Sequence, residues 1–383
     1  MGEIINIKRG SELELKIESL SYGGKGVAHY NDFVVFVKNA IPGQTVKALV
    51  YRKKPGYAEA RSLDIIHESP KAVDAPCGHF GVCGGCKVQN LDYSEQIIEK
   101  TRQVEDSFDR LGGFSGFKLD KIVPADPIFN YRNKMEFTFS SNRWILKNES
   151  VDKGSLFALG LHIPGRYDKI LDIDECHIQP KIGNKILSKA RDICLANPDL
   201  RPYEPKIHIG FLRYLMLRFG VRTDQIMVNM VTAYDDMNKL SPLIDGLLEN
   251  IPEITSIVNN VNTRKADVAF GEFETLIYGQ PVIEEKIGNL TFEISANSFF
   301  QTNTVQGEKL YDQVLNVAGL SGNEVVYDLY CGTGSISLYL AGHAKKVYGF
   351  EVIRSALEDA ERNAERNKIT NTQFMKANLD TFF

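Results

Sequence analysis

Short alternations of polar and apolar residues fill the first part of the chain and predict a small unit made of strands. Residues 12–17 alternate between the two classes, as a strand with one buried face does, and residues 33–37 form an apolar run. Glycine-containing turns separate these segments from two further strand patterns at 46–51 and 58–66. About five short strands of this kind fit an OB-like β-barrel over residues 1–69.

A basic hairpin is predicted between the last two of these strands. Arg52, Lys53 and Lys54 follow one another there, and Tyr57 lies three residues further on. Cations that contact phosphates and a ring that stacks on bases are typical of single-stranded RNA binding. The alternative is a solvated hairpin tip with no ligand.

The middle of the chain, residues 70–294, predicts a mixed α+β domain. Residues 93–111 follow a helical pattern that ends at a glycine pair, and we expect this helix to pack on the C-terminal domain. Between Arg201 and Arg222, Lys and Arg residues alternate with aromatic residues over predicted strands. This pattern favours an RNA-facing sheet, with a half-solvated sheet as the alternative.

The most informative pattern lies near the end. Val325 to Leu329 reads as a short buried strand, Gly332 and Gly334 form a turn, and a helical pattern follows. Glycines let a backbone approach a ligand closely, because no side chain intervenes. The next predicted strand ends in Glu351, where a carboxylate can accept hydrogen bonds from both hydroxyls of a ribose. The arrangement predicts an adenosine-containing cofactor.

Charge favours S-adenosylmethionine over a dinucleotide. Asp328 precedes the glycine turn, and Ser337 occupies the position where a dinucleotide loop has a third small residue. An acidic residue beside the turn would repel a pyrophosphate and attract the cationic end of S-adenosylmethionine. A dinucleotide remains the alternative.

A second short motif, residues 297–303, precedes a predicted helix at 305–317. Asn303 or Thr304 can cap that helix. Phe299 and Phe300 beside amide side chains would also suit a flipped base, stacked by a ring and hydrogen-bonded along its edge.

Composition narrows the class of protein only moderately. A formal net charge of −4 over 383 residues does not point to nucleic-acid binding, so such binding must rest on local patches. No run of eighteen apolar residues and no signal peptide is found, so we expect a cytoplasmic protein. Six cysteines in a large cytoplasmic chain indicate metal binding or catalysis more than disulfide bonds.

Three of these cysteines lie close together in the sequence. Cys77, Cys83 and Cys86 are surrounded by glycines, and Cys176 in a polar loop is the natural fourth ligand of a tetrahedral site. The spacing favours an iron–sulfur cluster over zinc, and His79 or His177 as a ligand would favour zinc.

Taken in order, these motifs resemble the RNA 5-methyluridine methyltransferases. Residues 21–28 with the basic hairpin resemble a TRAM domain, an RNA-binding barrel. With the cysteine cluster, residues 299–303 and residues 328–335, the nearest branch is the cluster-containing 23S rRNA (uracil-5-)-methyltransferases. The resemblance implies a multidomain α/β protein: a TRAM barrel (1–69), a central α+β domain with a four-cysteine cluster (70–294), and a Rossmann-like class I methyltransferase domain (295–383).

The resemblance also assigns site residues. It implies a [4Fe–4S] cluster on Cys77, Cys83, Cys86 and Cys176, and it places Phe299 near the target base. We expect Arg52, Lys53, Lys54 and Arg132 to contact RNA, and the protein to act as a monomer. The residues expected to bind S-adenosylmethionine are Gln301, Tyr330, Gly332, Gly334, Ser335, Glu351 and Asn378.

No catalytic residue is assigned from the sequence. In the family, a cysteine thiolate adds to C6 of uracil so that C5 accepts the methyl group, and a base then removes the C5 proton. The motifs that carry the two groups do not occur in these 383 residues, and Cys331 matches the cofactor loop instead. We therefore expect a truncated, inactive methyltransferase domain. The alternatives are a tRNA uracil-5-methyltransferase and an RNA-binding iron–sulfur protein without catalysis.

Overall fold

The computed structural model describes residues 7–146, 149, 156–265 and 268–378. They form two compact units, Met1–Pro124 and Ala125–Phe383. No helix in these ranges is long and apolar enough to cross a membrane.

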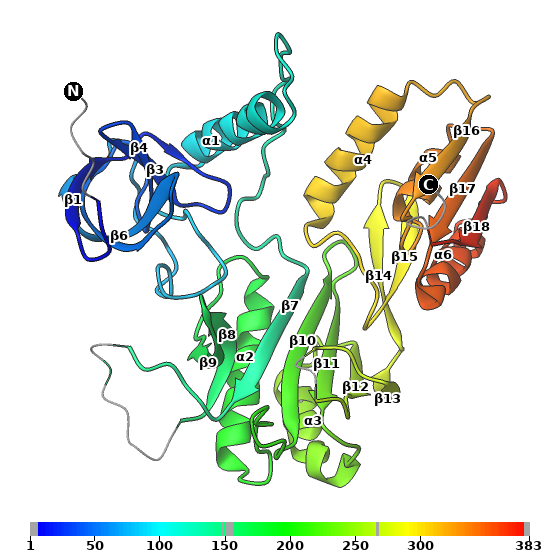
Figure 1. Ribbon diagram of the computed structural model, residues 1–383. Coiled ribbons are helices and arrows are strands. Elements are labelled where there is room, and N and C mark those ends of the chain that lie inside the picture. Colours follow the sequence, from blue (N-terminus) through cyan, green and yellow to red (C-terminus); the bar gives the residue numbers. More distant parts are fainter. Residues whose placement is uncertain (1–6, 147–148, 150–155, 266–267, 379–383) are drawn as a thin grey trace. The chain divides into compact units, whose positions relative to one another are not determined.

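The first unit is built on a six-stranded sheet that curls into a barrel-like shape (Figure 1). Apolar residues at alternate positions of five of the strands share one core, which includes Leu15, Val35 and Val50. The alternation read from the sequence therefore becomes a curled sheet with its apolar face inside. In the order β1-β5-β6-β4-β3-β2, the strands are β1 (Glu12–Lys16), β5 (Thr45–Lys53), β6 (Tyr57–His67), β4 (Phe33–Lys38), β3 (Gly26–Tyr30) and β2 (Ser19–Leu20).

Helix α1 (Tyr93–Asp106) packs against this sheet. Asp92 caps its first turn by accepting a hydrogen bond from the Ser94 N–H. Further along, the buried Glu99 carboxylate accepts from the Leu20 N–H at 2.7 Å. The helical path continues as a π-helical turn, Ser107–Leu111, and ends at Gly112. The α1 helix therefore belongs to the same unit as the barrel.

The second unit contains a seven-stranded sheet with helices α2 (Lys181–Ala196) and α3 (Met237–Asn250) beside each other on one side (Figure 1). All nine residues of its strand β10 are buried. In sheet order the strands are β13 (Phe273–Gly279), β12 (Ser256–Val261), β11 (Gln225–Thr232), β10 (Leu212–Gly220), β7 (Lys134–Ser140), β8 (Ala158–Ile163) and β9 (Arg166–Asp172).

The burial of β10 corrects one expectation. Arg213 and Arg218 were expected on an RNA-facing surface, but each is at most 3% exposed. Arg213 donates to the carbonyls of Asn262 and Arg264, and Arg218 donates to those of Ala296 and Ser298. Buried guanidinium groups are stable when they satisfy carbonyls in this way. These two arginines therefore connect chain segments and do not present charge to RNA.

The remaining elements hold the predicted cofactor turn. A hairpin of β14 (Val282–Ile287) and β15 (Leu290–Ser295) precedes α4 (Thr304–Ala318). Asn303 caps α4 by accepting from the Gln306 N–H, as its position predicted. A parallel sheet in the order β16-β17-β18 follows. Its strands are β16 (Val325–Leu329), β17 (Lys346–Glu351) and β18 (Thr372–Lys376), and its helices are α5 (Ser335–Ala341) and α6 (Arg354–Arg366).

One core joins the central sheet to this region. Met227 and Val258 of the central sheet pack in the same cluster as Phe292 and Leu338. The buried Glu285 carboxylate reinforces the junction, because it accepts hydrogen bonds from the Val221 N–H and the Thr304 hydroxyl.

Candidate active site

Three loops meet at one edge of the parallel sheet. The strands pair in parallel register, so the chain leaves β16, β17 and β18 on the same side. The glycine turn follows β16, Val352 follows β17, and Ala377 with Asn378 follows β18. Ligands of open parallel sheets bind outside this carboxyl edge. Of the predicted cofactor residues, Tyr330 and Asn378 are exposed here.

The two glycines of the turn have different reasons to be glycine. Both adopt positive φ, 55° at Gly332 and 75° at Gly334. A Cβ on Gly334 would lie 2.9 Å from Ala360 and Phe374, so this residue is needed for packing. A Cβ on Gly332 would meet nothing within 4 Å. Gly332 therefore faces open space, as expected of backbone that approaches a ligand.

Glu351 is held in place by backbone groups. Its Oε2 accepts from the Gly332 N–H at 3.1 Å, and its Oε1 accepts from the N–H groups of Val352 and Ile353. A carboxylate has about four acceptor sites, so one or more remain for the hydroxyls of a ribose. The contact also ties the end of β17 to the turn after β16.

Two pairs of polar side chains, Asp328 with Ser337 and Tyr311 with Ser335, stabilise the glycine turn. Asp328 accepts from the Ser337 hydroxyl at 2.6 Å, and burial raises the pKa of Asp328 although this hydrogen bond opposes the shift. The Tyr311 hydroxyl lies 2.7 Å from the Ser335 hydroxyl and also contacts the Gln301 side chain. Tyr311 thereby brings together two residues predicted to bind the cofactor. Sequence reasoning had not identified it.

Cys331 belongs to the turn and is a poor nucleophile. Burial, together with the charges of Asp328 and Glu351, raises the pKa of its thiol to about 12. The thiolate is the reactive form of cysteine, and it is nearly absent at neutral pH for such a group.

Residues 297–303, here called the Phe299 segment, contact the same turn. The Thr333 hydroxyl is 3.4 Å from the Phe299 carbonyl, and Arg218 fixes the carbonyls on either side of Asn297. The ring of Phe299 is 69% exposed, whereas Phe300 is buried in the core. An exposed ring held beside a cofactor turn is suited to stacking on a base.

A network of amides lies next to this segment. Asn297 donates to the Asn260 side chain at 3.0 Å and to the Glu274 carboxylate at 3.3 Å. Partial desolvation of its carboxyl raises the pKa of Glu274, although the residue as a whole is exposed. Sequence reasoning missed the network, although consecutive asparagines at 259 and 260 in an apolar strand were a usable signal.

Arg132 also lies beside the Phe299 segment. It forms an isolated bridge with Asn303, and its guanidinium donates to the Lys134 carbonyl. The adjacent Asn133 donates to the Gln301 carbonyl and contacts the Thr304 hydroxyl. The start of β7 thus positions the residues that follow Phe299.

The basic hairpin of the first unit is solvent-exposed. Arg52 and Lys53 end β5, Lys54 follows them in the turn to β6, and all three are exposed. Arg52 is 3.9 Å from the Glu59 carboxylate, and the Lys53 ammonium lies 5.8 Å from the centre of the Phe33 ring. These positions agree with the expected hairpin.

The predicted metal ligands do not form a recognisable metal site. Cys77, Cys83 and Cys86 belong to the first unit, and the buried Cys176 belongs to the second. Burial raises the pKa of Cys83. Among the residues that the structure describes, no three His, Cys, Asp or Glu side chains are arranged to hold a metal ion. The predicted cluster is not supported by this arrangement.

Two family models match parts of the chain. A model described as tRNA (Uracil-5-)-methyltransferase matches residues 275–382, and a TRAM domain model matches residues 7–63. The first match covers the cofactor turn, Glu351 and the Phe299 segment. It does not bear out the expectation of an inactive chain, because the methyltransferase region itself is recognised.

Relatives align with nearly the whole chain. An uncharacterized RNA methyltransferase of Chlorobaculum tepidum is 41% identical over 99% of this chain and 80% of its own length. Another, from Halalkalibacterium halodurans, is 36% identical over 96% of this chain and 78% of its own length.

A solved structure shares the fold. The tRNA (uracil-54, C5)-methyltransferase of Pyrococcus abyssi, in complex with S-adenosyl-L-homocysteine, superposes with a TM-score of 0.71 at 28% identity. The match covers 96% of this chain and 80% of that one, so it must include most of the barrel.

Proposed function

Because this chain belongs to the family of S-adenosylmethionine-dependent RNA (uracil-5-)-methyltransferases, we propose that it methylates C5 of a uracil in RNA. The observation that carries this proposal is the contact between Thr333 and the Phe299 carbonyl. It joins the turn expected to bind the cofactor to the exposed ring expected to stack on the target base.

The residues at the sheet edge fit the cofactor. S-adenosylmethionine, when bound, supplies a methyl group activated by a sulfonium charge. Glu351 accepts hydrogen bonds from the ribose hydroxyls, and Gly332 leaves room for the adenosine. Asp328 attracts the sulfonium end. The remaining predicted contacts are Gln301, Tyr330, Gly334, Ser335 and Asn378.

The Phe299 segment receives the base. The exposed ring stacks on a flipped uracil, and Asn297, hydrogen-bonded to Glu274, contacts the edge of that base. The segment therefore orients the base, while Cys331 stays a packing residue.

We propose 23S rRNA as the substrate, with tRNA as the second candidate. The basic hairpin and the cysteine pattern favour rRNA, and the likeness to the Pyrococcus abyssi tRNA enzyme favours tRNA. Transfer of tritiated methyl groups to undermodified 23S rRNA and to unmodified tRNA, followed by nucleoside analysis, separates the two. We expect 5-methyluridine in the rRNA. Its absence from both RNAs would contradict the proposed function.

We also propose that Cys77, Cys83, Cys86 and Cys176 bind a [4Fe–4S] cluster. Their spacing in the sequence supports this. Protein purified without air should carry about four irons per chain. Cys176→Ser should lower the iron content, whereas Cys194→Ser, at a buried thiol with a pKa of about 12, should not. Zinc in place of iron would overturn the assignment.

A further inference from the structure

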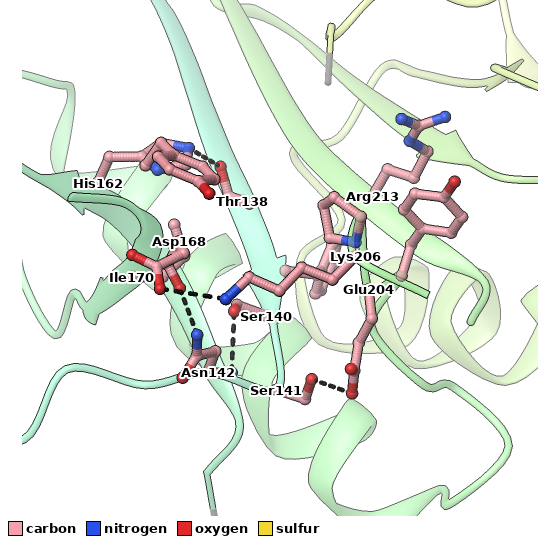
Figure 2. Close-up of a pocket in the computed structure, with 14 residues that line it drawn as sticks. Thr138, Ser140, Ser141, Asn142, His162, Asp168, Ile170, Glu204, Lys206 and Arg213 are labelled. Atoms are coloured by element: carbon pink, nitrogen blue, oxygen red, sulfur yellow. Dashed lines mark hydrogen bonds and ion pairs between the residues drawn. The ribbon is translucent and has the colours of Figure 1, made fainter. Parts of the chain in front are cut away.

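A pocket of 360 Å³ lies in the central sheet (Figure 2). This volume is at the lower end of the range for small-molecule sites, roughly 300–1,000 Å³. Strands β7, β8, β9 and β10 all contribute to its lining, together with the loop at 203–206. The residues that line it are Thr138, Phe139, Ser140, Ser141, Asn142, His162, Tyr167, Asp168, Ile170, Tyr203, Glu204, Pro205, Lys206 and Arg213.

The pocket is separate from the candidate active site. Arg213 lines the pocket, while Arg218, five residues along the same strand, holds the Phe299 segment. Five residues of antiparallel strand span about 17 Å. The two sites therefore lie at different positions along β10 and require different ligands or different parts of one ligand.

The charged side chains of the pocket already have ion-pair or hydrogen-bond partners. The Lys206 ammonium lies 3.4 Å from the Asp168 carboxylate, and Glu204 accepts from the Ser141 hydroxyl at 2.6 Å (Figure 2). Arg213 donates to the backbone carbonyls of Asn262 and Arg264. A phosphate would have to break these contacts to be bound. The pocket is therefore suited to a neutral ligand.

The lining combines flat rings with hydrogen-bonding groups. The Arg213 guanidinium lies 4.3 Å from the centre of the Tyr203 ring, and the Tyr167 ring is 80% exposed. His162 contacts Thr138 through Nε2, and its buried Nδ1 has no hydrogen-bond partner among the described residues (Figure 2). Exposed aromatic rings that stack on bases, beside polar groups that contact base edges, are typical of single-stranded RNA recognition.

We propose that this pocket binds a nucleobase of the RNA substrate other than the target uracil. The inference rests on the proposed function, because RNA is the ligand that offers neutral, planar, hydrogen-bonding rings near the methylated base. Tyr167 stacks on the bound base, and His162 contacts its edge.

The single tryptophan of the chain allows ligand binding in the pocket to be followed by fluorescence. Trp144 is two residues from Asn142, and its backbone N–H donates to the Ile170 carbonyl at 2.7 Å. Asn142 and Ile170 both line the pocket. Adenosine, guanosine, cytidine and uridine are titrated into the full chain, with tryptophan excited at wavelengths where nucleosides do not absorb. We expect at least one nucleoside to change the emission saturably.

Variants of Tyr167 then test the assignment. Tyr167→Ala should weaken binding of the effective nucleoside and of undermodified 23S rRNA by about five- to a hundredfold, as loss of one stacking ring does. Tyr167→Phe keeps the ring and should keep the binding. Phe273→Ala removes another exposed ring, on β13 outside the pocket, and should leave the nucleoside titration unchanged.

The pocket assignment and the proposed function can be contradicted independently of each other. If wild-type protein methylates RNA but no nucleoside changes the Trp144 emission and Tyr167→Ala binds RNA normally, the pocket assignment is wrong and the function stands. If nucleosides bind and the Tyr167 variants behave as expected, the pocket assignment stands whether or not methyl transfer is detected.

Discussion

At the scale of single residues, Asp328 combines burial with a charge that the cofactor needs. Asp328→Asn keeps an oxygen that accepts from Ser337 and removes the charge. We expect binding of S-adenosylmethionine to weaken roughly tenfold, because a sulfonium loses its counter-charge. S-adenosylhomocysteine lacks that positive charge and should bind almost unchanged. Calorimetric titration of both ligands measures the difference.

The same carboxyl gives a signed dependence on pH. Burial raises its pKa in the folded state, so its contribution to stability is present below the unfolded pKa and is lost as pH rises through the folded pKa. Asp328→Asn should flatten that part of the stability profile. Asp312→Asn, at an exposed carboxylate bonded to Tyr339, is the matched control. In the ligand titrations, equal weakening of S-adenosylmethionine and S-adenosylhomocysteine binding by Asp328→Asn would show that Asp328 acts through structure alone.

Residue-level prediction worked where backbone geometry constrains the residue type. The turn at Gly332 and Gly334 and the end of a strand at Glu351 lie where the spacing of these residues predicted them. The roles of Tyr311 and Glu274 depend on contacts between distant segments, and no local pattern encodes them.

At the scale of elements, the β5–β6 hairpin tests whether the first unit binds RNA through charge. Neutralising Arg52, Lys53 and Lys54 together should weaken RNA binding and reduce the slope of log K against log salt. Each lost phosphate contact removes about 0.7 from that slope for single-stranded RNA. Filter binding across a range of salt concentrations measures it.

A matched variant separates this effect from general charge. Lys47→Gln lies on the same strand, but its ammonium is 2.7 Å from the Glu12 carboxylate. This variant should leave the slope nearly unchanged. An unchanged slope in the triple variant would identify the hairpin as a solvated tip.

Prediction of elements succeeded for isolated strands and failed for buried charge. The three parallel strands lie where the apolar runs placed them. Strand β10 was also expected, but its arginines were assigned to the surface, because a charged residue is rarely buried. Their carbonyl partners lie more than forty residues away in the sequence, so the exception was not visible locally.

At the scale of the whole molecule, Arg218 connects the central sheet to the candidate base site. Arg218→Met leaves the buried Ala296 and Ser298 carbonyls without donors, at a cost of about 1–3 kcal/mol for each unsatisfied group. We expect unfolding at lower denaturant and a loss of methyl transfer greater than the loss of cofactor binding, because the Phe299 segment shifts.

The control is Arg222, which lies in the turn between β10 and β11. Arg222 pairs with Glu308 at a partly exposed position, and Arg222→Met should cost at most about 1 kcal/mol. If Arg218→Met retained full methyl transfer, the Phe299 segment would not depend on Arg218 for its position.

Strand β10 has a consequence for how the protein selects a uridine. It is hydrogen-bonded on both sides, to β7 and β11, and a strand held in this way has a fixed length. If one nucleobase is bound in the pocket of the central sheet, the length of β10 fixes the distance between that base and the methylated base. One nucleotide inserted between anchor and target should then move the methyl group to a neighbouring uridine. Methylation that stays on the original uridine would mean that the target is recognised by its own surroundings.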